Sequence, residues 1–419
     1  MSLSILPIIM MFFGAGGDMN QLLDFTDPQT YFEAQGIEFR AGALIEVLEE
    51  RATKDFEMVK AQEVKKLLAM RALGQMKDKA ALPALQKAAG SKKLFFSEYA
   101  SEAIAVIEGK EFVENGLDPA LLKRDLALLP AGIGLVVQAR LESGGSLDLK
   151  KVVGDAFAGQ DGVPSAEEML KQVNEGLGEV FKGIGNVRLD AVTMGVSADV
   201  GDDSGFVIII ARGKYDHRAM ESYVSRQAGT KPHSIGGTMF LGLDGDDAAL
   251  APVSNELLIL VSGPGWDQFP LDAVAAKLKE RPVEPVFSKE LQKVLARADQ
   301  SGEVWGGGLI SAGMKEAPPL APFDEFVLST SKLEASGKNR MKLDVVGSDP
   351  KAVKASIDEM KQQVGEGIAE FEQVGRPGME SMLELMKGMK FYSMGLNGTI
   401  SVTFDGNVLG LLVPMMRGL

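Results

Sequence analysis

The side chains that most often perform catalysis or bind metals are scarce in this chain. It has no cysteine, which excludes disulfides, thiolate nucleophiles, iron–sulfur clusters and cysteine-ligated zinc. It has two histidines, His217 in the first turn of an expected helix and His233 in a loop. Histidine is the usual general base at neutral pH, but the sequence suggests no third partner for either one. We expect surface or capping roles for both, with a ligand or catalytic role as the alternative.

Two groups of aspartates could bind a cation such as calcium, because each gathers three carboxylates in one turn. Neither group follows the twelve-residue calcium-loop pattern, and this composition is typical of solvated hairpin turns. We therefore expect structural turns and no bound metal, with a cation site as the alternative. The aspartates are Asp199, Asp202 and Asp203 in the first turn and Asp244, Asp246 and Asp247 in the second.

Glycine runs and nucleophile motifs give no stronger signal. Gly306 to Gly308 lies inside an apolar run, where glycine usually allows close backbone approach, and residues 14–17 lack the Lys-Ser/Thr of a phosphate loop. No G-x-S-x-G motif is present, so a serine hydrolase would lack its nucleophile. We expect no cofactor. A carboxylate pair formed only in the folded chain would be invisible here, which leaves a hydrolase as a third functional class.

Four methionines form the candidate partner-binding site. Met379, Met382, Met386 and Met389 are spaced 3, 4 and 3 residues apart, so a helix would carry them as one stripe. Thioethers on such a stripe can pack in a core, adapt to a protein partner or hold Cu(I). The core interpretation is the plainest, and the partner interface is its main alternative.

The elements that would position these residues come from an internal duplication. Residues 190–224 and 324–358 align without a gap at an offset of 134, and both show an alternating strand, a polar turn, a strand ending in glycine and an amphipathic helix. Residues 236–245 align with 397–406 at an offset of 161, so copy two has gained 27 residues after its helix. Few identical residues remain, and polar residues are not shared.

The repeat predicts two tandem, diverged α+β domains with antiparallel sheets, copy one at residues 116–270 and copy two at 285–419. Each begins with a helix and a strand, Pro119 to Leu128 before Gly132 to Leu141 in copy one and Leu291 to Ala296 before Val304 to Ala312 in copy two. Asp244-Gly245 and Asp405-Gly406 predict late hairpins. We expect copy one to have a ferredoxin-like, split βαβ arrangement, and copy two to have the same arrangement without the helix between its first two strands.

Residues 18–115 predict an all-α N-terminal domain. Within it, residues 62–109 resemble HEAT-like helical repeats. The resemblance implies paired helices with a surface that could dock another protein, and it assigns no functional residue. The residues that carry it are Ala69, Ala72, Leu73 and Gly74 in one helix, Asp78, Ala81, Leu82, Pro83 and Leu85 in the next, and Ala100, Ala103, Ile104 and Ile107 in a third.

The first 17 residues are a candidate signal or anchor. Residues 3–13 form an apolar run of eleven, too short for the roughly 20 residues that span a bilayer. Small residues at Ala15 and Gly17 suit an export cleavage site, but no basic residue precedes the run. The alternatives are an uncleaved segment that contacts a membrane surface or partner, and ordinary core. Together with the lack of cysteine, this apolar start favours a bacterial periplasmic, cell-surface or membrane-associated location, and a cytoplasmic location is the alternative.

The charge balance also limits the partners. The formal charge of −14 comes from 58 acidic and 44 basic residues with no basic cluster, which argues against nucleic acid. Duplication that keeps the fold but not the polar residues favours a non-enzymatic interaction or scaffold subunit of a bacterial envelope or larger assembly. The alternative is an exported binding protein with a small-molecule cleft between the two copies.

Overall fold

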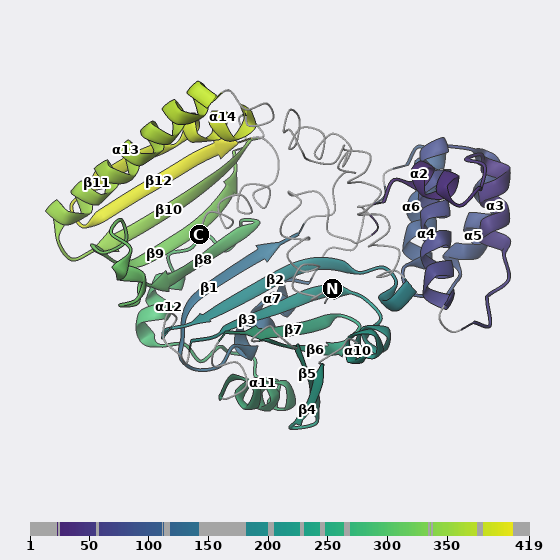
Figure 1. The fold of residues 1–419 in the computed structure, drawn as a ribbon, viewed down its shortest axis with the longest axis horizontal. Coiled ribbons are helices and arrows are strands. Elements are labelled where there is room, and N and C mark those ends of the chain that lie inside the picture. The colour runs from purple at the N-terminus through teal and green to yellow at the C-terminus, as the bar shows by residue number, and fades with distance from the viewer. Residues whose placement is uncertain are drawn as a thin grey trace.

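The computed structural model describes residues 23, 26–55, 58–110, 112, 118–141, 182–199, 205–226, 230–243, 248–263, 269–333, 336, 338–374 and 380–404. The chain is an α+β protein in which N-terminal helices precede one large antiparallel sheet (Figure 1). The predicted class and this order of helices and sheet are confirmed. The apolar segment of residues 1–17 lies outside the described residues.

The N-terminal helices pack around α4. Gly74 of α4 allows a close approach to α6, because a Cβ at this position would lie 3.0 Å from Ala103 Cα. Asp78 caps the turn that follows α4, and Pro83 occupies the first turn of the next helix, where proline is tolerated. The HEAT-like classification itself stays a prediction. The helices are α2 (Pro28–Ala34), α3 (Ala41–Glu49), α4 (Val59–Met76), η3 (Lys79–Ala81), α5 (Leu82–Ala89) and α6 (Phe96–Glu108).

Within the described residues, twelve strands form a single sheet in the order β11-β12-β10-β9-β8-β1-β2-β3-β7-β6-β5-β4. Every described strand pair is antiparallel. The strands are β1 (Ile133–Arg140), β2 (Arg188–Ser197), β3 (Val207–Lys214), β4 (Lys231–Ile235), β5 (Thr238–Leu243), β6 (Ala248–Ser254), β7 (Leu257–Ser262), β8 (Val304–Leu309), β9 (Phe323–Lys332), β10 (Asn339–Gly347), β11 (Lys390–Met394) and β12 (Asn397–Phe404).

The predicted split βαβ strand order is wrong. In that arrangement another strand separates the first two strands of the domain, whereas β1 and β2 are direct antiparallel neighbours. The other edge of β1 is occupied by β8 of copy two, so the two copies share one sheet. The aligned residues 236–245 and 397–406 contain β5 and β12, but these two strands occupy different places in the sheet. β12 pairs directly with β10, whereas β7 and β6 lie between β5 and β3, the strand that corresponds to β10. Apolar alternation predicts strands but does not select their neighbours.

The two copies pair about a local two-fold axis. Gly195 lies opposite Val136, and its repeat equivalent Ser329 lies opposite Trp305, so Val136 and Trp305 occupy the same place in the two copies. In the β1–β8 pair, Val136 faces Gly307 and Gln138 faces Trp305, which centres the axis on Val137 and Gly306. A self-complementary contact of this kind is the geometry of a symmetric dimer, here built within one chain.

The repeat also preserves a β-bulge. Leu189 pairs with Gly213 and Ala191 with Arg212, so Asp190 is the extra residue, and at the offset of 134 Asp324 is the extra residue between Phe323 and Glu325. Glycine is required opposite both bulges, because a Cβ on Gly213 or Gly347 would overlap with a carbonyl oxygen of the neighbouring chain segment. The hairpin geometry therefore survived although most side chains changed.

Helices cover both faces of the sheet. On one face, α7 (Pro119–Leu128), α11 (Phe269–Glu280) and α12 (Lys289–Leu295) share a buried apolar cluster that includes Ile208 and Ile210 of β3. On the opposite face, α10 (His217–Ser225) packs over copy one, and α13 (Pro350–Val374) and α14 (Glu380–Gly388) pack over copy two. The side chains of successive strand residues alternate between these two layers.

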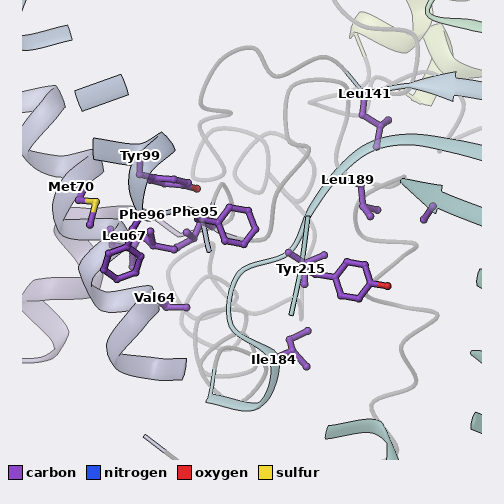
Figure 2. Close-up of a cluster of buried hydrophobic side chains, with 14 of the residues drawn as sticks. Val64, Leu67, Met70, Phe95, Phe96, Tyr99, Leu141, Ile184, Leu189 and Tyr215 are labelled. Atoms are coloured by element: carbon purple, nitrogen blue, oxygen red, sulfur yellow. The ribbon is translucent and has the colours of Figure 1, made fainter. Parts of the chain in front are cut away.

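The helical segment contacts the copy-one half of the sheet, at β2 and the end of β3, through a shared apolar cluster (Figure 2). Val64 of α4 and Phe96 and Tyr99 of α6 belong to the same buried cluster as Leu189 of β2 and Tyr215, which follows β3. The Tyr215 hydroxyl donates a hydrogen bond of 2.5 Å to the Leu257 carbonyl. The cluster therefore joins the helices to the sheet as one packed core.

Charged residues surround this junction. Glu98 of α6 contacts Arg188 and lies 2.8 Å from Lys214 Nζ. Lys60 Nζ lies 2.7 Å from a carboxylate oxygen of Asp216, which also caps α10. Burial acts to raise the pKa of Asp216, but the hydrogen bonds from Lys60 and from backbone N–H groups outweigh it and lower that pKa. These ion pairs fix the orientation of the helical segment against β2, β3 and α10.

Candidate partner-binding surface

The described part of the methionine stripe packs inward. Met386 is half-buried, and a Cβ on Gly367 of α13 would lie 3.0 Å from its Cε. Met389 is also half-buried, beside the core cluster that contains Leu385 and Val402. Met379 lies outside the described residues, as does the side chain of Met382. Within the described residues, the stripe therefore fills the space between α14, α13 and β12.

A group of exposed apolar side chains lies on the hairpin that follows this helix. Tyr392 is 58% exposed, Met394 80% and Leu396 41%, the first two on β11 and the third in its turn. Met394 pairs with Asn397, so a two-residue turn joins β11 to β12. The alternation of Lys390, Tyr392 and Met394 was the available signal, but sequence reasoning did not separate these residues from core.

The hairpin forms one edge of the sheet. β11 pairs with β12 on one side and has no strand on the other within the described chain. Tyr392 and Met394 project on the face opposite Phe391, which packs against the core beneath α13. An edge strand presents a row of unpaired backbone N–H and C=O groups, which is a template for another strand.

The opposite edge of the sheet is protected. β4 carries Pro232, which has no N–H to donate to an added strand, whereas both edge strands begin with an exposed lysine, Lys231 in β4 and Lys390 in β11. His233 lies in the same strand and is half-buried. Of the two edges in the described sheet, the β11 edge is therefore the one without proline and with exposed apolar side chains.

The sheet surface beside β11 is polar. The Thr399 hydroxyl donates a 2.6 Å hydrogen bond to Asp344, and Lys342 Nζ lies 2.7 Å from the same carboxylate group. These residues face the same side as Tyr392 and Met394, because Tyr392 lies opposite Thr399 and Thr399 opposite Asp344. The apolar hairpin therefore has a polar rim, as expected of a contact surface rather than a misplaced core.

The remaining sequence candidates do not converge on a site. His217 begins α10, where its Nδ1 donates to the Asn255 side-chain oxygen at 2.8 Å. Asp199 is described, but the other five turn aspartates lie outside the described residues. Within the described part of the chain, no group of three or more His, Asp or Glu is placed to hold a metal ion.

The glycine run and the predicted cleft between the copies meet at the β1–β8 junction. A Cβ on Gly306 would lie 2.5 Å from the Val136 carbonyl oxygen, so glycine serves close strand packing here. The copies join edge to edge as a continuous sheet at this junction. Among the described helices, none is both long and apolar enough to cross a membrane.

Comparison with known proteins gives a distant structural likeness. No protein-family model and no curated protein matches the chain. The chain is similar to crystal forms III, IV and I of the protein TP0453, at 10% sequence identity and TM-scores of 0.38, 0.36 and 0.36. Each alignment covers 70% of this chain and 98%, 95% and 96% of the respective TP0453 chains.

Proposed function

We propose that this chain is a non-enzymatic interaction subunit that takes up a strand of a partner protein at β11. The observation that carries the proposal is the exposure of Tyr392 and Met394 on a sheet edge that has no proline. Strand addition uses backbone hydrogen bonds for affinity and alternate side chains for specificity. The partner strand should therefore place apolar side chains at every second residue, next to Tyr392 and Met394.

The proposal extends to the setting of the subunit. The chain combines an apolar start at residues 3–13 with a complete lack of cysteine. We place it in a bacterial envelope or a larger assembly, with the HEAT-like helices as a second docking surface. The helical segment suits this role because its ion pairs and apolar cluster hold it rigidly to the sheet.

Photo-crosslinking in the native cells tests the edge. A photoreactive residue at position 392 or 394 should crosslink to one protein of discrete mass, and the same residue at Ser234 of β4 should not. A crosslinked product of twice the mass of the chain would mean that the molecule bound at β11 is a second copy of this chain. That product, or equal labelling at all three positions, would overturn the proposal.

Two lysine variants separate partner binding from folding. Tyr392→Lys with Met394→Lys should weaken association at least about tenfold, because burial of each large apolar side chain contributes about 1.5–3 kcal/mol. The thermal midpoint should not change, since both side chains are exposed. Met386→Lys is the matched control: it should lower the midpoint because Met386 packs on α13. Unaltered association in the double-lysine variant would count against β11.

A further inference from the structure

Copy one buries polar residues where copy two has none. Asp125 on α7 and Arg212 on β3 are buried, as are Gln138 on β1 and Thr193 on β2. The same places in copy two, given by the two-fold and by the offset of 134, hold apolar residues or glycine. The equivalents are Val294 for Asp125, Val346 for Arg212, Gly307 for Gln138 and Val327 for Thr193.

The buried polar residues form two contacts. Arg212 Nε donates to both Asp125 carboxylate oxygens, at 2.8 and 3.0 Å, and Nη2 donates to one of them at 2.6 Å. Gln138 Nε2 donates to the Thr193 hydroxyl at 2.8 Å. A buried ion pair seldom stabilises a fold relative to apolar residues of similar size, because both charges lose their hydration. Copy two shows that this fold needs no charge here.

The ion pair lies at a pocket. A cavity of about 770 Å³ opens between α7, the end of α11, the β4–β5 turn and the start of β7, and Arg212 lines it. Its volume is within the range of small-molecule sites, roughly 300–1,000 Å³. Nε and Nη2 of Arg212 are engaged by Asp125, whereas Nη1 has no partner among the described residues. Asp125 thus fixes the guanidinium at the wall of the pocket.

The charge of the pocket is opposite to that of the chain. Arg124, Arg212, Lys279 and Arg281 line it, and no Asp or Glu among the described residues does, although the chain carries a net charge of −14. Arg124, Lys279 and Arg281 have no ion-pair partner in the part of the chain that the structure describes. Asp125 compensates the charge of Arg212, and the other three cations raise the local concentration of anions.

The rest of the lining is mainly apolar, with two hydroxyls. Leu121 and Leu128 of α7 and Leu278 of α11 contribute hydrocarbon, and Thr238 and Ser254 contribute hydrogen-bonding groups. An inorganic anion would leave this apolar surface unused. A neutral apolar compound would leave Arg124 and Arg281 without a counter-ion.

We propose that this pocket binds an organic anion, a carboxylate or phosphate group on an apolar body, with the acidic group at Arg212 and Arg281 and the apolar body against the leucines of α7 and α11. Asp125 is a positioning residue, because it contacts Arg212 and does not line the pocket. The site belongs to copy one and is separate from the β11 edge, so either proposal can fail without the other.

Calorimetric titration of the full chain tests the ligand class with four probes. Decanoate or decyl phosphate should bind, inorganic phosphate at least about tenfold more weakly, and decanol no more tightly than inorganic phosphate. Binding of either acidic amphiphile supports the proposal, and the tighter one identifies the preferred head group. Equal binding of decanol and decanoate, or no binding of either amphiphile, would overturn it.

Variants assign the binding to these residues. Asp125→Val combined with Arg212→Val copies the copy-two residues and should weaken binding about tenfold or more, since a charge-assisted hydrogen bond is lost. Arg124→Gln with Arg281→Gln changes only exposed side chains and should also weaken binding, which keeps the test valid if the first variant fails to fold. Lys123→Gln, on the same helix but paired with Glu284 outside the pocket, is the control and should bind as the wild type does. Unchanged affinity in the Arg124→Gln, Arg281→Gln double variant would overturn the assignment of binding to this pocket.

Discussion

Replacing Asp125 and Arg212 together by valine should leave the protein as stable as the wild type or more stable, whereas each single valine should destabilise it. Asp125→Val leaves the buried Arg212 cation without its carboxylate, and Arg212→Val leaves a carboxyl group in an apolar layer. The double variant reproduces Val294 and Val346, which occupy these places in copy two.

The magnitudes follow from the cost of burying charge. Removing one partner of a buried ion pair costs about 3–5 kcal/mol, while replacing both by apolar residues is neutral or stabilises by about 1–4 kcal/mol. Burial raises the pKa of Asp125 to about 6, against the opposing effect of Arg212. Relative to an unfolded value near 3.8, that shift of roughly two units corresponds to about 3 kcal/mol.

The sign of the pH dependence is fixed by this shift. A carboxyl whose pKa is higher in the folded state binds protons more tightly there, so folding stability from this group falls as pH rises from about 4 to about 6. The double variant lacks this group. Its stability relative to the wild type should therefore increase over the same interval, by up to about 3 kcal/mol.

Urea denaturation of the wild type, both single variants and the double variant gives the coupling free energy, which should be at least about 6 kcal/mol if each single variant costs about 3 kcal/mol or more and the double variant costs nothing. Repeating the measurement at pH 4.5 and 7.5 tests the titration. The reasoning would be refuted if the double variant were as unstable as the less stable of the two single variants. It would also be refuted if the difference in stability between the double variant and the wild type did not change with pH.

Two further predictions concern stability alone. Gly213→Ala should destabilise the protein by at least about 2 kcal/mol, because its Cβ would overlap with the backbone of β2. Gly365→Ala in α13 has open space and should stabilise the protein by about 0.5–1 kcal/mol. Urea denaturation midpoints compare the two variants, and equal midpoints would contradict the bulge geometry. Asp216→Ala should cost about 1 kcal/mol more than Asp216→Asn, because asparagine retains the cap of α10 and loses only the ion pair to Lys60. The contribution of the Asp216 carboxylate to folding stability should disappear as pH falls below about 4, because its pKa is lowered in the folded state. A stability difference between Asp216→Ala and the wild type that does not change with pH would contradict this prediction.

The sequence by itself determined the local elements and the duplication. The predicted helix from Pro119 to Leu128 is α7, and the strand predicted at residues 132–141 contains β1. Asp244-Gly245 lies between β5 and β6, which pair as the predicted hairpin requires. These features depend on short-range rules: helix capping, the alternation of strand side chains and the backbone freedom of glycine.

Only the tertiary structure decided how the elements pair. Apolar alternation in β1 is equally compatible with a partner from its own copy or from the other copy, and packing placed β8 beside it. The same packing turned Met386 inward, left Met394 on an open edge, and brought Arg212 and Arg281 to one pocket from residues 69 positions apart in the chain. Sequence periodicity states which face of an element is apolar, but the element that covers this face is selected by the whole core, whose contacts are mostly distant in sequence.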